Sequence, residues 1–105
     1  MVNNEEILKI KDRIIAAVDV EKLYLFGSYA YGTPHKDSDY DFYMVIPNGS
    51  MRPIEAMQQA RLAIWDLDVK PVDLLAGTVD IFARRSVGIT IEHKIANEGV
   101  LVYER

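Results

Sequence analysis

The feature that most constrains this chain is the pair Gly27-Ser28, followed after ten residues by Asp39-Tyr40-Asp41. The Gly-Ser pair ends the apolar run 23–26, and the aspartate pair opens the apolar run 42–46. Apolar runs of this length that are bounded by turn residues are typical of buried strands. The pattern therefore predicts a strand that ends in a tight Gly-Ser turn and a strand that begins with two carboxylates.

This combination predicts a particular chemistry. If Asp39 and Asp41 lie on a strand, they point to the same side, about 6–7 Å apart, and can share a hard cation such as Mg²⁺. A small Gly-Ser turn brings backbone N–H groups close to a phosphate. Taken alone, Asp-x-Asp is compatible with surface charges on an edge strand, and Gly-Ser with an ordinary turn. Together they favour phosphoryl or nucleotidyl transfer.

A third carboxylate, Asp73, lies in the apolar run 72–75. A charged side chain in a buried strand is costly unless it is paired or binds a metal. Asp73 either pairs with a lysine or arginine, emerges at a strand edge near Pro71, or joins the other two carboxylates as a metal ligand or general base. We interpret it as the third member of the site, because two carboxylates already await a further ligand.

The rest of the chain alternates helices and strands. Asn3 or Asn4 is expected to cap an amphipathic helix whose first turn is acidic. Ser50 is expected to cap a second helix, with Pro53 in its first turn and Trp65 in the core. Further elements are predicted as a strand over 69–75, helices near 79–85 and ending about 97, and a strand over 100–103. The pattern indicates an α/β or α+β fold, with a small mixed sheet flanked by helices.

Composition narrows the functional class. At 105 residues the sequence is expected to be a single domain, 1–105, without room for a second substrate-binding domain. The net charge of −4 argues against gripping a long nucleic acid by its phosphates. The absence of cysteine excludes disulfides and thiolate metal sites. The polar, acidic start and the lack of a membrane-length apolar stretch predict a cytoplasmic protein that does not engage a membrane.

The same residues carry a family resemblance. The segment 25–28, then Ala30, Gly32 and the segment 38–42, resemble the signature of minimal nucleotidyltransferases in the polymerase-β-like superfamily. The resemblance extends over nearly the whole chain, including 97–104, and implies the fold of that superfamily.

The resemblance also implies roles for individual residues. Gly27 and Ser28 would hold the triphosphate of the nucleotide, and Asp39 and Asp41 would bind two Mg²⁺ ions. Asp73 would complete the catalytic metal site and help to activate the acceptor hydroxyl. Tyr31 departs from the pattern, because many relatives have arginine or lysine there.

Minimal nucleotidyltransferases are often antitoxins, and this resemblance implies a partner. The partner would be a HEPN-type toxin, and the reaction would move AMP from ATP to a tyrosine hydroxyl of that toxin. Two alternatives remain open: a non-catalytic antitoxin that masks its partner, and a subunit that modifies a small hydroxylated molecule. The base preference of the nucleotide and any homo-oligomer are left open by the sequence.

Overall fold

The computed structural model describes residues 4–32 and 39–105 and contains one mixed four-stranded sheet flanked by helices. The elements follow in the order α1 (Glu5–Ala17), β1 (Lys22–Phe26), α2 (Ser28–Tyr31), β2 (Tyr40–Ile46), α3 (Pro53–Ala63), β3 (Val72–Thr78), α4 (Val79–Arg85), α5 (Ile91–Glu98) and β4 (Val100–Glu104). The predicted α+β class is confirmed. None of the helices in the described part of the chain is long and apolar enough to cross a bilayer.

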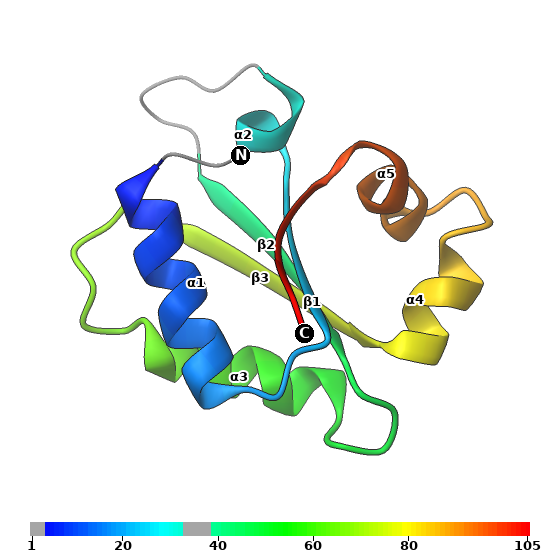
Figure 1. Cartoon of the computed structure of the whole chain (residues 1–105), viewed down its shortest axis with the longest axis horizontal. Helices are drawn as coiled ribbons and strands as arrows, with labels where there is room; N and C mark the ends of the chain where they lie inside the picture. The colour runs from blue at the N-terminus through cyan, green and yellow to red at the C-terminus, as the bar shows by residue number, and fades with distance from the viewer. Residues whose placement is uncertain (1–3, 33–38) are drawn as a thin grey trace.

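The sheet has the strand order β3-β2-β1-β4. Strand β1 pairs antiparallel with both β2 and β4, whereas β2 and β3 run parallel. Helices α1 and α3 cover one face of the sheet, and α4 and α5 lie over the other (Figure 1). Because side chains alternate between the faces of a strand, each strand contributes to both layers.

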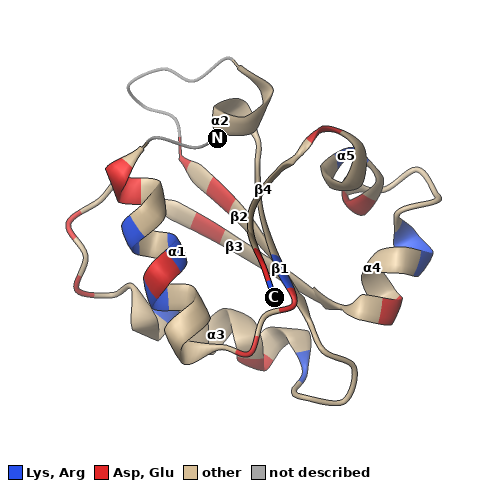
Figure 2. Cartoon of the chain, viewed as in Figure 1, with Lys and Arg blue, Asp and Glu red and all other residues tan. Residues whose placement is uncertain are grey.

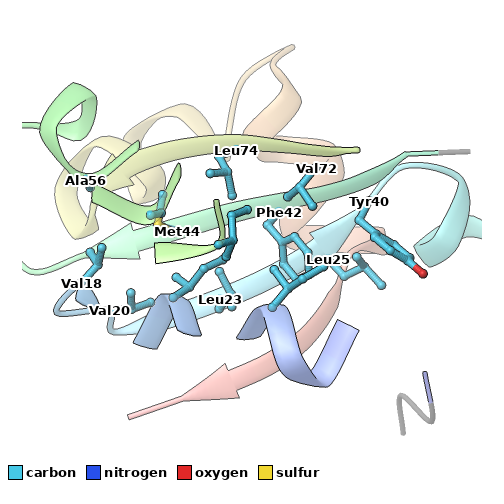
Figure 3. Close-up of a cluster of buried hydrophobic side chains, with 14 of the residues drawn as sticks. Val18, Val20, Leu23, Leu25, Tyr40, Phe42, Met44, Ala56, Val72 and Leu74 are labelled. Carbon is cyan, nitrogen blue, oxygen red and sulfur yellow. The ribbon is translucent and has the colours of Figure 1, made fainter. Parts of the chain in front are cut away.

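The larger core lies between the sheet and helices α1 and α3 (Figure 3). Tyr40, Phe42 and Met44 from β2 are at most 1% exposed in this layer. Tyr43 and Val45 point to the opposite face and belong to a second cluster with Phe26 and Ile95. Asp41 therefore lies on the face that α4 and α5 cover.

The predicted start of α1 is confirmed, whereas the predicted start of α3 is wrong. Asn4 Oδ1 accepts hydrogen bonds from the backbone N–H groups of Glu6 and Ile7. Helix α3 begins with Pro53 at its first position and is capped by Arg52, not Ser50. The Glu55 carboxylate accepts from the Arg52 backbone N–H and fixes this start.

The prediction that Trp65 lies in the core is also wrong, since its side chain is 79% exposed. Helix α3 instead buries Ala56 and Ala60 completely. Small side chains let this helix pack closely against its neighbours, and Trp65 lies beyond the last turn, which ends at Ala63. Sequence analysis predicted the large residue to be in the core because large apolar side chains bury more apolar area.

The third strand begins three residues later than the predicted start at Val69 and extends to Thr78. The segment before it contains Pro71, whose carbonyl accepts from the Tyr40 N–H. Strand β3 is the edge of the sheet, and Asp73 is exposed on it. Val72 and Leu74 are buried as expected for this run, whereas Asp73 itself is exposed, so the alternative that it emerges on an edge strand is confirmed.

Candidate active site

The Gly-Ser turn joins the end of β1 to the short helix α2. Gly27 has φ +74° and ψ −159°, a conformation that is essentially restricted to glycine. Its carbonyl accepts from the backbone N–H groups of Ala30 and Tyr31, both at 3.0 Å, so the chain turns at once into the helix. Ser28 is thereby fixed at the first position of α2, directly after the strand.

The structure brings this turn against Asp41. Phe26 pairs with Asp41 across strands β1 and β2, so Gly27 lies just beyond the carboxylate-bearing position. A Cβ placed on Gly27 would overlap the Asp41 carboxylate. A glycine is therefore needed at position 27 for two reasons: its backbone conformation, and the room that it leaves for Asp41.

Asp73 is the register partner of Asp41 on the neighbouring strand β3. In a parallel pair, register partners lie on the same face at a strand separation of about 4.8 Å. Figure 2 shows the two acidic positions side by side on β2 and β3. Two residues that are far apart in sequence thus form one carboxylate pair on the face that carries the Gly-Ser turn.

The electrostatics of Asp41 reflect this crowding. Partial burial, the charge of Asp73, a side-chain hydrogen bond with Asp73 and the charge of Asp39 raise the pKa of Asp41 to about 6. All three carboxylates therefore lie within electrostatic range of one another. At neutral pH Asp41 is mostly ionised, and the site carries repulsion that a cation would relieve.

The donor atoms at this site are of the type that binds Mg²⁺, but in the described part of the chain they are not arranged as a preformed metal site. Within residues 4–32 and 39–105, no group of three or more His, Cys, Asp or Glu side chains is arranged to hold a metal ion. The donors around Asp41 are all carboxylate oxygens, which hard cations such as Mg²⁺ prefer. The donor set fits Mg²⁺, and the register of β2 and β3 places Asp41 and Asp73 side by side.

A groove on the other side of the molecule is less suited to this chemistry. It has a volume of about 560 Å³ and is lined by Met57, Gln58, Arg61, Leu62 and Leu74. Leu74 belongs to the α3 layer, so this groove opens on the face opposite to the carboxylates. It lacks acidic lining residues, and we therefore place the candidate active site at the Gly-Ser turn.

Sequence reasoning missed a buried network beside the carboxylates. Tyr43, two residues after Asp41, donates its hydroxyl proton to Glu92 Oε2 at 3.0 Å, and Arg85 Nε donates to Glu92 Oε1 at 3.0 Å. Gly77 leaves room for the Tyr43 hydroxyl, because a Cβ there would overlap it. The network ties α4 and α5 to the sheet. Gly77 within a strand was its one sequence signal, since such a glycine often marks a close approach.

Replacing Glu92 by glutamine should destabilise the fold by about 2 kcal/mol at pH 7, because the buried hydrogen bonds to a charged group are lost. The Arg85 guanidinium and the Tyr43 hydroxyl hold the pKa of Glu92 below its usual 4.5 against the opposing effect of burial. A carboxyl with a lowered folded pKa stabilises above its unfolded pKa and loses that contribution as pH falls. The difference from wild type in urea unfolding should therefore shrink below about pH 4.5.

The matched control is Glu55→Gln, which breaks an exposed pair with Arg52 at 3.2 Å. Such exposed pairs contribute little to stability. Equal effects of the two substitutions at pH 7 would contradict a structural role for the Glu92 network.

Comparison with known proteins identifies the family that this chain resembles. The family described as polymerase beta, nucleotidyltransferase, matches residues 8–105. Protein adenylyltransferase MntA of Shewanella oneidensis is 29% identical over 98 residues, which are 92% of this chain and 62% of that protein. The chain thus spans less than two thirds of the length of this curated relative.

Solved structures show the same fold. A Sulfolobus solfataricus protein with an inferred nucleotidyltransferase function superposes with a TM-score of 0.64 at 21% identity, covering 92% of this chain and 76% of that one. A toxin–antitoxin structure with AMP-PNP gives a TM-score of 0.55 at 20% identity, covering 99% of this chain and 75% of the other. At this level of identity the likeness concerns the fold.

Proposed function

The chain belongs to the polymerase β nucleotidyltransferase family, and on that premise we propose that it is a Mg²⁺-dependent adenylyltransferase acting on a partner toxin. The reaction moves AMP from ATP to a hydroxyl group, a tyrosine of a HEPN-type toxin. The observation that carries the proposal is the meeting of the Gly27-Ser28 turn with the Asp41–Asp73 pair. It supports a triphosphate and an acceptor hydroxyl lying side by side.

Each residue has a distinct role in this proposal. The turn at Gly27 and Ser28 receives the triphosphate through backbone N–H groups and the serine hydroxyl. Asp39, Asp41 and Asp73 would hold two Mg²⁺ ions, and these would supply positive charge to the triphosphate and lower the pKa of the acceptor hydroxyl. Asp73, exposed at the sheet edge, is accessible to an acceptor that arrives from outside.

The transfer itself is an in-line displacement at the α-phosphorus. A bond forms between the acceptor oxygen and the α-phosphorus, and the bond to the oxygen that bridges to the β-phosphate breaks. Pyrophosphate leaves with the electron pair of that bond. Asp73 receives the acceptor proton, which a carboxylate beside the attacking oxygen can do.

The partner is proposed from the kinds of proteins that resemble this chain. One relative is a protein adenylyltransferase, and the structural neighbour with AMP-PNP is a toxin–antitoxin complex. Residues 1–105 are proposed to act as one catalytic domain whose acceptor comes from the partner. A masking antitoxin and a subunit that modifies a small hydroxylated molecule are the competing functions.

Transfer of label from ATP tests the proposal. The protein is incubated with α-³²P-ATP, Mg²⁺ and the toxin candidate encoded by the neighbouring reading frame, and label on the partner is mapped by peptide analysis. We expect label on a tyrosine and its loss when EDTA replaces Mg²⁺. Neutralisation of the partner without any label would support masking, and label on a small molecule alone would support the third function.

A further inference from the structure

A lysine from the far end of the chain lies over the helix that follows the Gly-Ser turn. Lys94 of α5 places its Nζ 4.7 Å from the ring centroid of Tyr31, the last residue of α2. A cation above an aromatic face is attracted by the ring. The contact fixes a positive charge at the end of α2, one helical turn from Ser28.

The packing of the two tyrosines of α2 shows on which face of the sheet Lys94 lies. Tyr29 packs against Tyr40 in the α1–α3 layer and receives a hydrogen bond from Lys70 at 2.7 Å. Tyr31 packs with the second cluster, which contains Tyr43 and lies on the carboxylate face. Lys94 therefore lies on the face that carries Asp41, whereas Lys70 contacts α2 from the opposite layer.

The surroundings of Tyr31 place it close to the carboxylates. The pKa of Tyr31 is raised chiefly by burial and further by the charges of Glu98 and Asp41, against a backbone hydrogen bond with Gly27 that lowers it. The tyrosine thus spans the distance from the Gly-Ser turn to α5. Lys94 contacts the ring of this tyrosine from α5.

Lys94 is also available to a ligand. Its side chain is 54% exposed, and its partner within α5 is Glu98 at 4.0 Å. An exposed ion pair of this kind contributes little to stability, so exchanging it for a phosphate costs little. A triphosphate adds roughly four negative charges to a site that already contains three carboxylates, and a nearby cation lowers that repulsion.

We propose that Lys94, positioned by Tyr31, binds the β- and γ-phosphates of the nucleotide and stabilises the departing pyrophosphate. The α-phosphorus would lie at the carboxylates, and Lys94 of α5, whose Nζ lies over the Tyr31 ring at the end of α2, would reach the phosphates beyond it. Tyr31 acts as a positioning residue in this arrangement. The inference rests on the proposed adenylyltransferase function and adds a phosphate-binding residue to it.

Isothermal titration calorimetry with Mg²⁺ tests the assignment, using ATP and AMP as separate ligands and no acceptor. Lys94→Gln should weaken ATP binding about tenfold, the loss expected for one charge-assisted hydrogen bond. It should leave AMP binding unchanged, because AMP lacks the β- and γ-phosphates. Lys94→Arg should retain most of the ATP affinity, and Tyr31→Lys in the Lys94→Gln background should restore it.

The matched control is Lys70→Gln, which removes the lysine on the other tyrosine of α2 and should leave ATP affinity unchanged. Equal ATP affinity of Lys94→Gln and wild type would overturn the assignment while leaving the proposed function intact. An equal loss for AMP and ATP would also overturn it, since it would indicate a general effect on the site. If the wild-type protein bound no ATP with Mg²⁺, the proposed function would fail together with this inference.

Discussion

Replacing Asp39 and Asp41 together by asparagine should reduce nucleotidyl transfer by about 10³-fold or more, while the fold is retained. The amides nearly preserve the shape of the side chains but remove the charges proposed to hold Mg²⁺ and, through it, the triphosphate. A loss of this size corresponds to about 4 kcal/mol of transition-state stabilisation. Initial rates of label transfer from ATP to the partner measure it, and circular dichroism verifies the fold.

The chain supplies a matched control in a second Asp-x-Asp. Asp66 and Asp68 have the same spacing but are exposed, and Asp66 pairs with Arg13 at 2.7 Å on the opposite side of the fold. Asp66→Asn with Asp68→Asn changes the net charge equally and should leave the transfer rate unchanged. A wild-type rate for the Asp39/Asp41 variant would refute the catalytic assignment, and equal neutralisation of the partner by both variants would favour the masking function.

The same variant should be more stable than wild type when Mg²⁺ is absent. The pKa of Asp41 is raised to about 6 from an ordinary 3.8, so the folded state binds the proton more tightly than the unfolded state. Stability of the wild type therefore falls as pH rises from about 4 to 6. The gain from asparagine should appear above that interval, as a higher melting temperature at pH 7.5 than wild type.

Part of the geometry of the site could be predicted from local sequence. Gly27 and Asp41 each adjoin a strong apolar run, and strand alternation is enough to place Asp41 with Tyr43 and opposite Phe42. That these two strands pair, with Phe26 against Asp41, was visible in the structure alone. The roles of Gly27, Ser28, Asp39, Asp41 and Asp73 in binding and catalysis remain predictions.

The features that sequence analysis did not predict correctly depend on contacts between distant parts of the chain. Trp65 was placed inside by its apolar character, but the packing of α3 is decided by the small residues Ala56 and Ala60. The exposure of Asp73 was left open among three alternatives, because the apolar run 72–75 does not reveal that its strand is a sheet edge. The contact of Lys94 with Tyr31 joins two segments that are far apart in the sequence, and local patterns carry no signal for such a pair.

The substitution Gly27→Ala adds a single methyl group, and we expect it to be more damaging at this position than elsewhere in the chain. Alanine strongly disfavours φ +74° with ψ −159°, and its Cβ would overlap the Asp41 carboxylate. We expect a loss of about 3 kcal/mol in the free energy of unfolding, from backbone strain and displacement of the carboxylate together. ATP affinity should fall about 100-fold if the displaced carboxylate no longer holds Mg²⁺ beside the turn.

Gly49 separates the two causes of this loss, because it has a similar φ of +76° and no atom within 4 Å of an added Cβ. Gly49→Ala should cost about 1 kcal/mol through strain alone and leave ATP affinity unchanged. Combining Gly27→Ala with Asp41→Ala removes the overlap, so the double variant should be more stable than the sum of the single effects predicts, by about 1 kcal/mol. Urea unfolding measures the wild type and all four variants, which include Asp41→Ala alone. Strict additivity would mean that the glycine serves the backbone alone, and that the contact between the turn and Asp41 is not what requires a glycine at position 27.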